Sequence, residues 1–149
     1  MKKITLLLLL MTANICAQQT VIHNDLEPFV VEFVKEAKKR NIDGVSIILN
    51  IKKIIYVNDI SVFPVPYNTI GLYDVKNKSI YIDKRARNYN YNARRLIVFH
   101  EIGHSMGLND GKGIMSTEIN FKDFKNIIDN WSEELNKLFN NAKKNHDRH

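Results

Sequence analysis

Two histidines and a glutamate stand close together in the segment H-E-I-G-H, at His100, Glu101 and His104. On a helix, residues four apart lie about one turn apart on the same face, so both imidazoles can reach one metal ion. A glutamate directly after the first histidine can lie beside that ion and accept a proton from water without being a ligand. The pattern therefore predicts metal-assisted hydrolysis, with Zn²⁺ as the metal and Glu101 as the general base.

The alternative interpretation of this segment is a core helix that carries two hydrogen-bonded histidines. Residues 94–99, R-R-L-I-V-F, enter the motif as a mainly apolar run, as expected for a buried helix. A glutamate in the middle of such a helix is costly to bury without a partner. Glu101 therefore favours a metal site over a purely structural helix.

Gly107 and Asp110 extend the motif beyond the second histidine. Glycine is the favoured residue for a left-handed C-terminal cap, so we expect the helix to stop just after Met106. The chain can then turn and bring Asp110 back as a third ligand, which leaves one position for water, as in catalytic zinc sites. The alternative for Asp110 is an ordinary turn residue, because Asn-Asp-Gly has strong turn chemistry.

The stretch H-E-I-G-H-S-M-G-L-N-D, with a methionine close behind, resembles the metzincin zinc peptidases, whose pattern is H-E-x-x-H-x-x-G-x-x-H followed by a methionine turn. It is most similar to the snapalysin-like variant, in which aspartate replaces the third histidine. The resemblance implies that His100, His104 and Asp110 bind zinc and that Glu101 is the catalytic base. It also implies that Met115 packs beneath the metal without binding it.

The resemblance is specific over residues 96–116, and a likeness over residues 24–140 is weaker. Only four residues separate Asp110 from Met115, fewer than is usual in matrixin-type members, so an apolar anchor for the loop is the alternative role of Met115. No tyrosine follows shortly after Met115, so the sequence does not identify an oxyanion stabiliser.

The resemblance also implies an α+β fold, in a small single-domain metzincin-like zincin. A twisted mixed sheet would be backed by two long helices, with zinc on the active-site helix and a C-terminal helix at the end. Substrate would bind in extended form along an edge strand, by main-chain pairing. Residues 70–74 are the candidate edge, where Gly71 would permit close approach; an ordinary core hairpin is the alternative.

Hydrophobic periodicity and turn residues predict the elements that must position these side chains. The expected order is a helix over 25–40 with Asn24 as its N-cap, strands over 45–49 and 54–57, a proline-containing loop over 63–66, a hairpin over 69–83, the motif helix over 92–106 and a final helix over 122–142.

Residues 1–17 predict a secretory signal peptide, and residues 18–149 a single metallopeptidase domain. The segment begins with Lys2 and Lys3, continues with an apolar run that is too short to span a bilayer, and ends with Ala17 before the expected cleavage point. Export to the periplasm or the medium follows. Lipoprotein anchoring at Cys16 is the alternative, and Ile15 disfavours it because a small residue is required before the lipidated cysteine.

The formal net charge of +6 does not by itself indicate a nucleic-acid partner, since two of these charges belong to the signal segment. The remaining excess is expected to be solvated surface, and the sequence holds no recognisable nucleic-acid motif. The expected partner is a protein or peptide substrate, with no nucleic acid, no stable membrane insertion and a monomeric state.

Three other functions stay open at this point. A gluzincin-type peptidase would take Glu133 or Glu134 on the final helix as its third ligand. An exported zinc-binding interaction or inhibitory module would keep the site without turnover, although such a module has no evident need for Glu101. A basic surface-binding protein would carry the motif by accident and would bind no metal.

Overall fold

The computed structural model describes residues 19–118 and 120–146 of the chain. This part forms a four-stranded sheet and five α-helices, a mixed arrangement that is compatible with the predicted α+β class. The predicted signal segment and Cys16 lie outside the described residues. Among the residues that are described, no helix has the length and apolar character needed to cross a membrane.

The sheet combines parallel and antiparallel strands. Its strands are β1 (Val21–Ile22), β2 (Lys53–Val57), β3 (Gly71–Asp74) and β4 (Ser79–Asp83), in the order β1-β2-β4-β3. β2 runs parallel to β1 and β4, whereas β3 runs antiparallel to β4. The predicted strand over 54–57 and the predicted hairpin over 69–83 are confirmed, and β3 is the outermost strand on its side.

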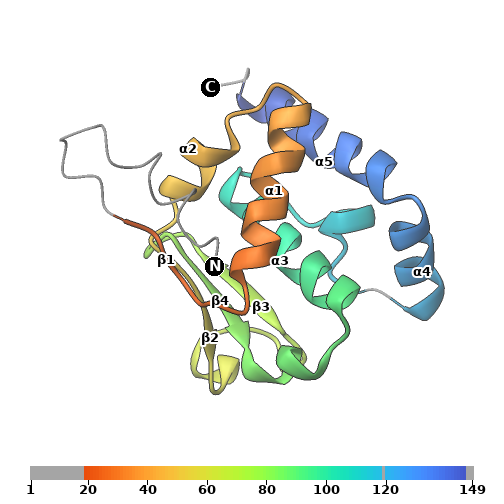
Figure 1. Ribbon diagram of the computed structural model, residues 1–149. Helices are drawn as coiled ribbons and strands as arrows, with labels where there is room; N and C mark the ends of the chain where they lie inside the picture. The colour runs from red at the N-terminus through yellow and green to blue at the C-terminus, as the bar shows by residue number, and fades with distance from the viewer. Residues whose placement is uncertain (1–18, 119, 147–149) are drawn as a thin grey trace, which may run out of the picture.

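The helices cover the sheet in layers (Figure 1). They are α1 (Glu27–Lys39), α2 (Gly44–Leu49), α3 (Tyr91–Ser105), α4 (Phe121–Asp129) and α5 (Trp131–His146), with 3₁₀ turns η2 (Ile60–Val62), η3 (Lys84–Asn88) and η4 (Gly113–Met115). α1 and α3 lie between the sheet and the terminal pair α4 and α5 (Figure 1). α3, which carries the H-E-x-x-H motif, is therefore in the middle of the molecule.

Three phenylalanines join the helices in the core. The ring of Phe33 on α1 lies 5.3 Å from that of Phe99 on α3 and 5.2 Å from that of Phe139 on α5, measured between centroids. All three side chains are fully buried. Burial of this apolar surface is the main force that fixes α3 against its neighbours.

The prediction of a strand over residues 45–49 is wrong, because this segment forms α2. The side chain of Asp43 caps the helix: it accepts a hydrogen bond from the Ser46 amide at 3.0 Å and another from the Ser46 hydroxyl. Ile48 is buried while Val45 is 44% exposed, a spacing that suits one short helical turn. The periodicity of a short apolar run does not distinguish a strand from a helix, and the cap at Asp43 favours the helix.

The prediction of one helix over residues 122–142 is also wrong, because the segment divides into α4 and α5 at Asn130. Asn130 leaves the helical region, with φ −109° and ψ 28°, and it caps the end of α4: its main-chain amide and its side chain both donate to the carbonyl of Asn126, at 3.1 and 2.9 Å. The break lets the indole of Trp131 reach the core, 5.2 Å from the ring of Phe99. Asparagine was thus a stop signal within an otherwise helical pattern.

The first helix begins later than predicted. Its N-cap is Leu26, without a side-chain cap, and Asn24 does not cap it. Pro28 occupies the first helical turn, where its missing N–H costs nothing, and Leu26 is almost completely buried. Core burial and proline therefore set this boundary. The motif helix differs from its predicted bounds by a single residue at each end.

Truncation of the central aromatic cluster should destabilise the protein strongly. We expect Phe33→Ala to lower the free energy of unfolding by about 3–5 kcal/mol, because it removes a fully buried ring and leaves a cavity. Val62→Ala, at a side chain that is 75% exposed, should change it by less than about 0.5 kcal/mol. Urea unfolding measures both values, and similar losses in the two variants would contradict the proposed core.

Candidate metal centre

The helix α3 ends immediately after the second histidine, and the chain reverses direction there. Gly107 has φ +79°, in the left-handed region, as the sequence predicts. Its amide donates to the carbonyl of His104 at 2.9 Å, and the amide of Leu108 donates to the carbonyl of Gly103 at 3.1 Å. These two bonds form a Schellman cap, which turns the chain back along the helix.

This reversal brings Asp110 to the two histidines. The Nε2 atoms of His100 and His104 lie 3.0 Å apart, and their rings are close to perpendicular, at 84°. Oδ1 of Asp110 lies 3.5 Å from Nε2 of His100 and 3.3 Å from Nε2 of His104. The structure thus brings together the three predicted ligands, and among the described residues they form a group that could hold a metal ion.

Main-chain hydrogen bonds fix how each imidazole presents its ring nitrogens. Nδ1 of His100 lies 2.9 Å from the carbonyl oxygen of Ile114, and Nδ1 of His104 lies 2.8 Å from that of Leu108. Because a carbonyl oxygen only accepts, we assign a proton to Nδ1 in both rings. In neutral histidines both Nε2 atoms then carry a lone pair, directed toward the space that they share with Asp110.

Three electron-pair donors at such short separations repel one another unless a cation lies among them. Burial is the main cause that lowers the pKa of His100, so this imidazole stays neutral at neutral pH instead of supplying the positive charge itself. Two neutral imidazoles and one carboxylate are a donor set that suits Zn²⁺. The residues present therefore fit the metal that the sequence predicts.

Glu101 lies on the face of α3 that meets β3. Its side chain is buried, and its carboxyl group occupies the place where a side chain at position 71 would stand: a Cβ on Gly71 would lie 2.9 Å from Cδ of Glu101. The neighbour that approaches Gly71 closely is thus the Glu101 side chain, and close approach of a substrate main chain at Gly71 stays a prediction. Only glycine leaves room for the carboxylate between β3 and α3.

Burial raises the pKa of Glu101 to about 8, and the backbone amide of Tyr73 on β3 offsets part of this rise. The charge of Asp110 raises the pKa a little further, because a second negative charge disfavours ionisation. A buried carboxyl group whose pKa is displaced toward neutrality suits proton transfer. Glu101 does not belong to the candidate ligand group, which consists of His100, His104 and Asp110.

Met115 is buried against the motif helix. Its Cε lies 3.1 Å from the position that a Cβ on Gly103 would take, so the absence of a side chain at Gly103 provides the space for the thioether. This contact agrees with a packing role and does not distinguish a methionine beneath the metal from an anchor of the loop.

The structure places Glu133 and Glu134 away from the ligand group. Glu133 is exposed and pairs with Lys137 at 2.9 Å. Glu134 is buried, pairs with the same lysine at 2.8 Å, and packs against Gly113. Neither belongs to the group of His100, His104 and Asp110.

Sequence reasoning missed the main-chain groups that orient the ligands. The carbonyl oxygens of Leu108 and Ile114 have no side-chain signature, so no residue type could reveal them. The glycine inside the motif, Gly103, was a usable signal, because a glycine in the middle of a helix often marks close packing.

No family model matches the chain, and neither a curated protein nor a solved structure was found to be similar to it.

Removal of the Asp110 carboxylate tests the ligand set. We expect the protein to bind one Zn²⁺ and Asp110→Ala to weaken that binding by more than about 100-fold, because even removing a hydrogen-bond partner of a ligand costs about 10–100-fold. Asp129→Ala, an exposed aspartate on α4, should leave the affinity unchanged. Competition with a chromophoric chelator measures both.

Retention of tight zinc binding by Asp110→Ala would contradict the assignment. It would instead favour Glu133 or Glu134 as the third ligand.

Proposed function

We propose that this protein is a zinc-dependent endopeptidase that hydrolyses peptide bonds in protein or peptide substrates. The observation that carries this proposal is the arrangement of His100, His104 and Asp110 around one point, with both Nδ1 atoms held by main-chain carbonyls. A pure metal-storage site would need no buried glutamate next to it. Glu101 supplies the additional group that hydrolysis requires.

The metzincin-like plan is part of this proposal. Its support is a mixed sheet with an antiparallel outermost strand, a motif helix packed beside that strand and a buried methionine shortly after the third ligand. The gluzincin alternative has less support, because Glu133 and Glu134 stand outside the ligand group.

The outermost strand β3 is the candidate for binding the substrate main chain. It pairs with β4 on one side, and the sheet order places no strand on its other side within the described residues. An extended peptide along that edge would receive main-chain hydrogen bonds with little demand on its side chains. Gly71, at the start of β3, would hold the peptide close to Glu101.

The residues of the site have separate tasks in the proposed hydrolysis. His100, His104 and Asp110 hold the zinc ion, which when bound supplies a Lewis acid that polarises the substrate carbonyl and a water molecule. Glu101 accepts the proton of the attacking water and then delivers it to the leaving amine. Burial of Glu101 keeps bulk water away from this carboxylate and raises its basicity.

Removal of the general base tests the proposal directly. We expect Glu101→Ala to bind zinc as the wild type does and to cleave casein or a mixed peptide library about 10²–10⁴-fold more slowly, since proton transfer contributes that much. Glu118→Ala, an exposed glutamate outside the site, is the matched control and should cleave normally.

The zinc content of each variant must be measured beside its activity. Zinc bound in all variants with no cleavage by the wild type would favour the binding or inhibitory module. No zinc in the wild type would overturn the proposal.

The pH profile follows from the Glu101 carboxyl group. Only its ionised form accepts a proton, so activity should fall as the pH drops through its pKa, which burial raises from 4.5 to about 8. A bound cation lowers this pKa again, so the acidic limb should lie between these two values. We expect maximal cleavage at neutral to mildly alkaline pH. Initial rates in constant-ionic-strength buffers check this, and a maximum near pH 5 would contradict it.

A further inference from the structure

A short turn after Asp110 connects the third ligand to the rest of the site. Residues 111–115 are closed by a hydrogen bond from the amide of Gly111 to the carbonyl of Met115, at 2.7 Å. Asp110 directly precedes this turn, so the closure limits where its carboxylate can lie. We call residues 111–115 the support turn.

The support turn also orients the first ligand. Its residue Ile114 provides the carbonyl oxygen that holds Nδ1 of His100. Ile114 and Met115 are both buried, and Met115 packs on Gly103 of α3. One turn therefore determines the position of two of the three ligands, and a displacement of the turn would move both.

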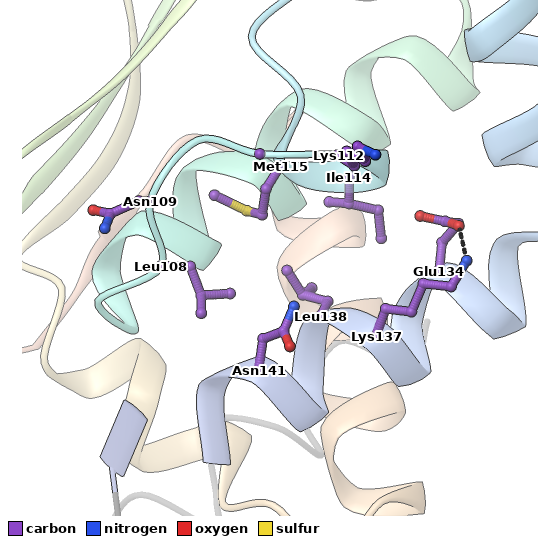
Figure 2. Close-up of a pocket in the computed structure, with 10 residues that line it drawn as sticks. Leu108, Asn109, Lys112, Ile114, Met115, Glu134, Lys137, Leu138 and Asn141 are labelled. Carbon is purple, nitrogen blue, oxygen red and sulfur yellow. Dashed lines mark hydrogen bonds and ion pairs between the residues drawn. The ribbon is translucent and has the colours of Figure 1, made fainter. Parts of the chain in front are cut away.

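α5 packs against the other side of the support turn. Glu134 reaches Gly113, whose φ is +63°: a Cβ at that position would lie 3.0 Å from Cδ of Glu134, and closer still to its Oε2. The side chain of Glu134 is 9% exposed. Figure 2 shows it extending from α5 toward the segment that carries Ile114, beside a cavity of about 90 Å³ between this loop and the helix.

The ion pair of Glu134 with Lys137 does not explain why the Glu134 carboxylate is buried. Its ion pair with Lys137, drawn in Figure 2, duplicates the pair that the exposed Glu133 makes with the same lysine. Only Glu134 is buried, and only Glu134 meets the support turn. The difference between the two glutamates is therefore contact with Gly113 and not charge.

We propose that Glu134 is a positioning residue for the metal centre: by contact with Gly113 it holds the support turn in the arrangement that presents Asp110 and orients His100. The proposal rests on the proposed zinc function and deepens it, since it assigns control of metal affinity to α5. Glu134 touches neither the metal ligands nor the reacting atoms.

Two substitutions separate the reach of this side chain from its charge. Glu134→Asp keeps the carboxylate and shortens the side chain by one methylene, so contact with Gly113 is lost. Glu134→Gln keeps the length and removes the charge. Glu133→Asp is the matched control, because it makes the same change at the neighbouring residue, which pairs with the same lysine and is exposed. An acidic residue remains in the first turn of α5 in both aspartate variants.

The measurements are the dissociation constant for Zn²⁺, by competition with a chromophoric chelator, and the visible absorption spectrum of the Co²⁺-loaded protein. We expect Glu134→Asp to weaken zinc binding about tenfold and to change the Co²⁺ spectrum, because a displaced support turn moves the Ile114 carbonyl that holds His100, and loss of such a partner costs about 10–100-fold. Glu134→Gln, which keeps the contact, should bind zinc as the wild type does. Glu133→Asp should match the wild type in both readouts.

The outcomes separate this proposal from the proposed function. No Zn²⁺ binding by the wild type would overturn the function, and with it this proposal. Tight binding by the wild type, with unchanged affinity and spectrum in Glu134→Asp, would overturn the positioning role alone. A loss in Glu134→Gln as large as that in Glu134→Asp would show that the negative charge is required as well as the length, and would overturn a role that depends on contact alone.

Discussion

The two hydrogen bonds from imidazole Nδ1 atoms to main-chain carbonyl oxygens are the interactions on which the site depends. Each one commits the proton of a neutral histidine to Nδ1, and so leaves the lone pair of Nε2 facing the other ligand atoms. The acceptors, at Leu108 and Ile114, follow α3 in the chain. The helix must therefore end directly after the second histidine and the chain must return along it, which the left-handed Gly107 accomplishes.

The core must also hold α3 in place, because this helix carries both histidines and Glu101. Phe99 of α3 packs against Phe33 on α1 and Trp131 on α5, while Glu101 faces β3 on the sheet side. Burying a carboxyl group is unfavourable, and the raised pKa of Glu101 reflects that cost. The aromatic packing offsets it. The same burial that makes Glu101 unfavourable for stability places its pKa in the range that proton transfer uses.

The sequence predicted the parts of the fold in which a local signal and the tertiary contacts agree. The motif helix has an apolar approach and a glycine stop, and its predicted bounds were nearly correct. The prediction of a strand over residues 45–49 was wrong because a short apolar run fits a strand as well as a short helix. The Asp43 cap favours the helix. The prediction of a single final helix was wrong because the apolar spacing continues through Asn130, whereas the backbone leaves the helical region at this residue and the asparagine caps α4.

The same distinction applies to the candidate site. The identities of His100, His104 and Asp110 follow from spacing, because a helix and one turn suffice to bring them together. Their orientation does not, since it comes from main-chain carbonyls and from the contact of Glu134 with Gly113, across 21 positions of sequence. Side-chain motifs therefore indicate which atoms can bind a metal. How firmly they are held depends on backbone groups and on a distant helix, and neither leaves a pattern within the motif itself.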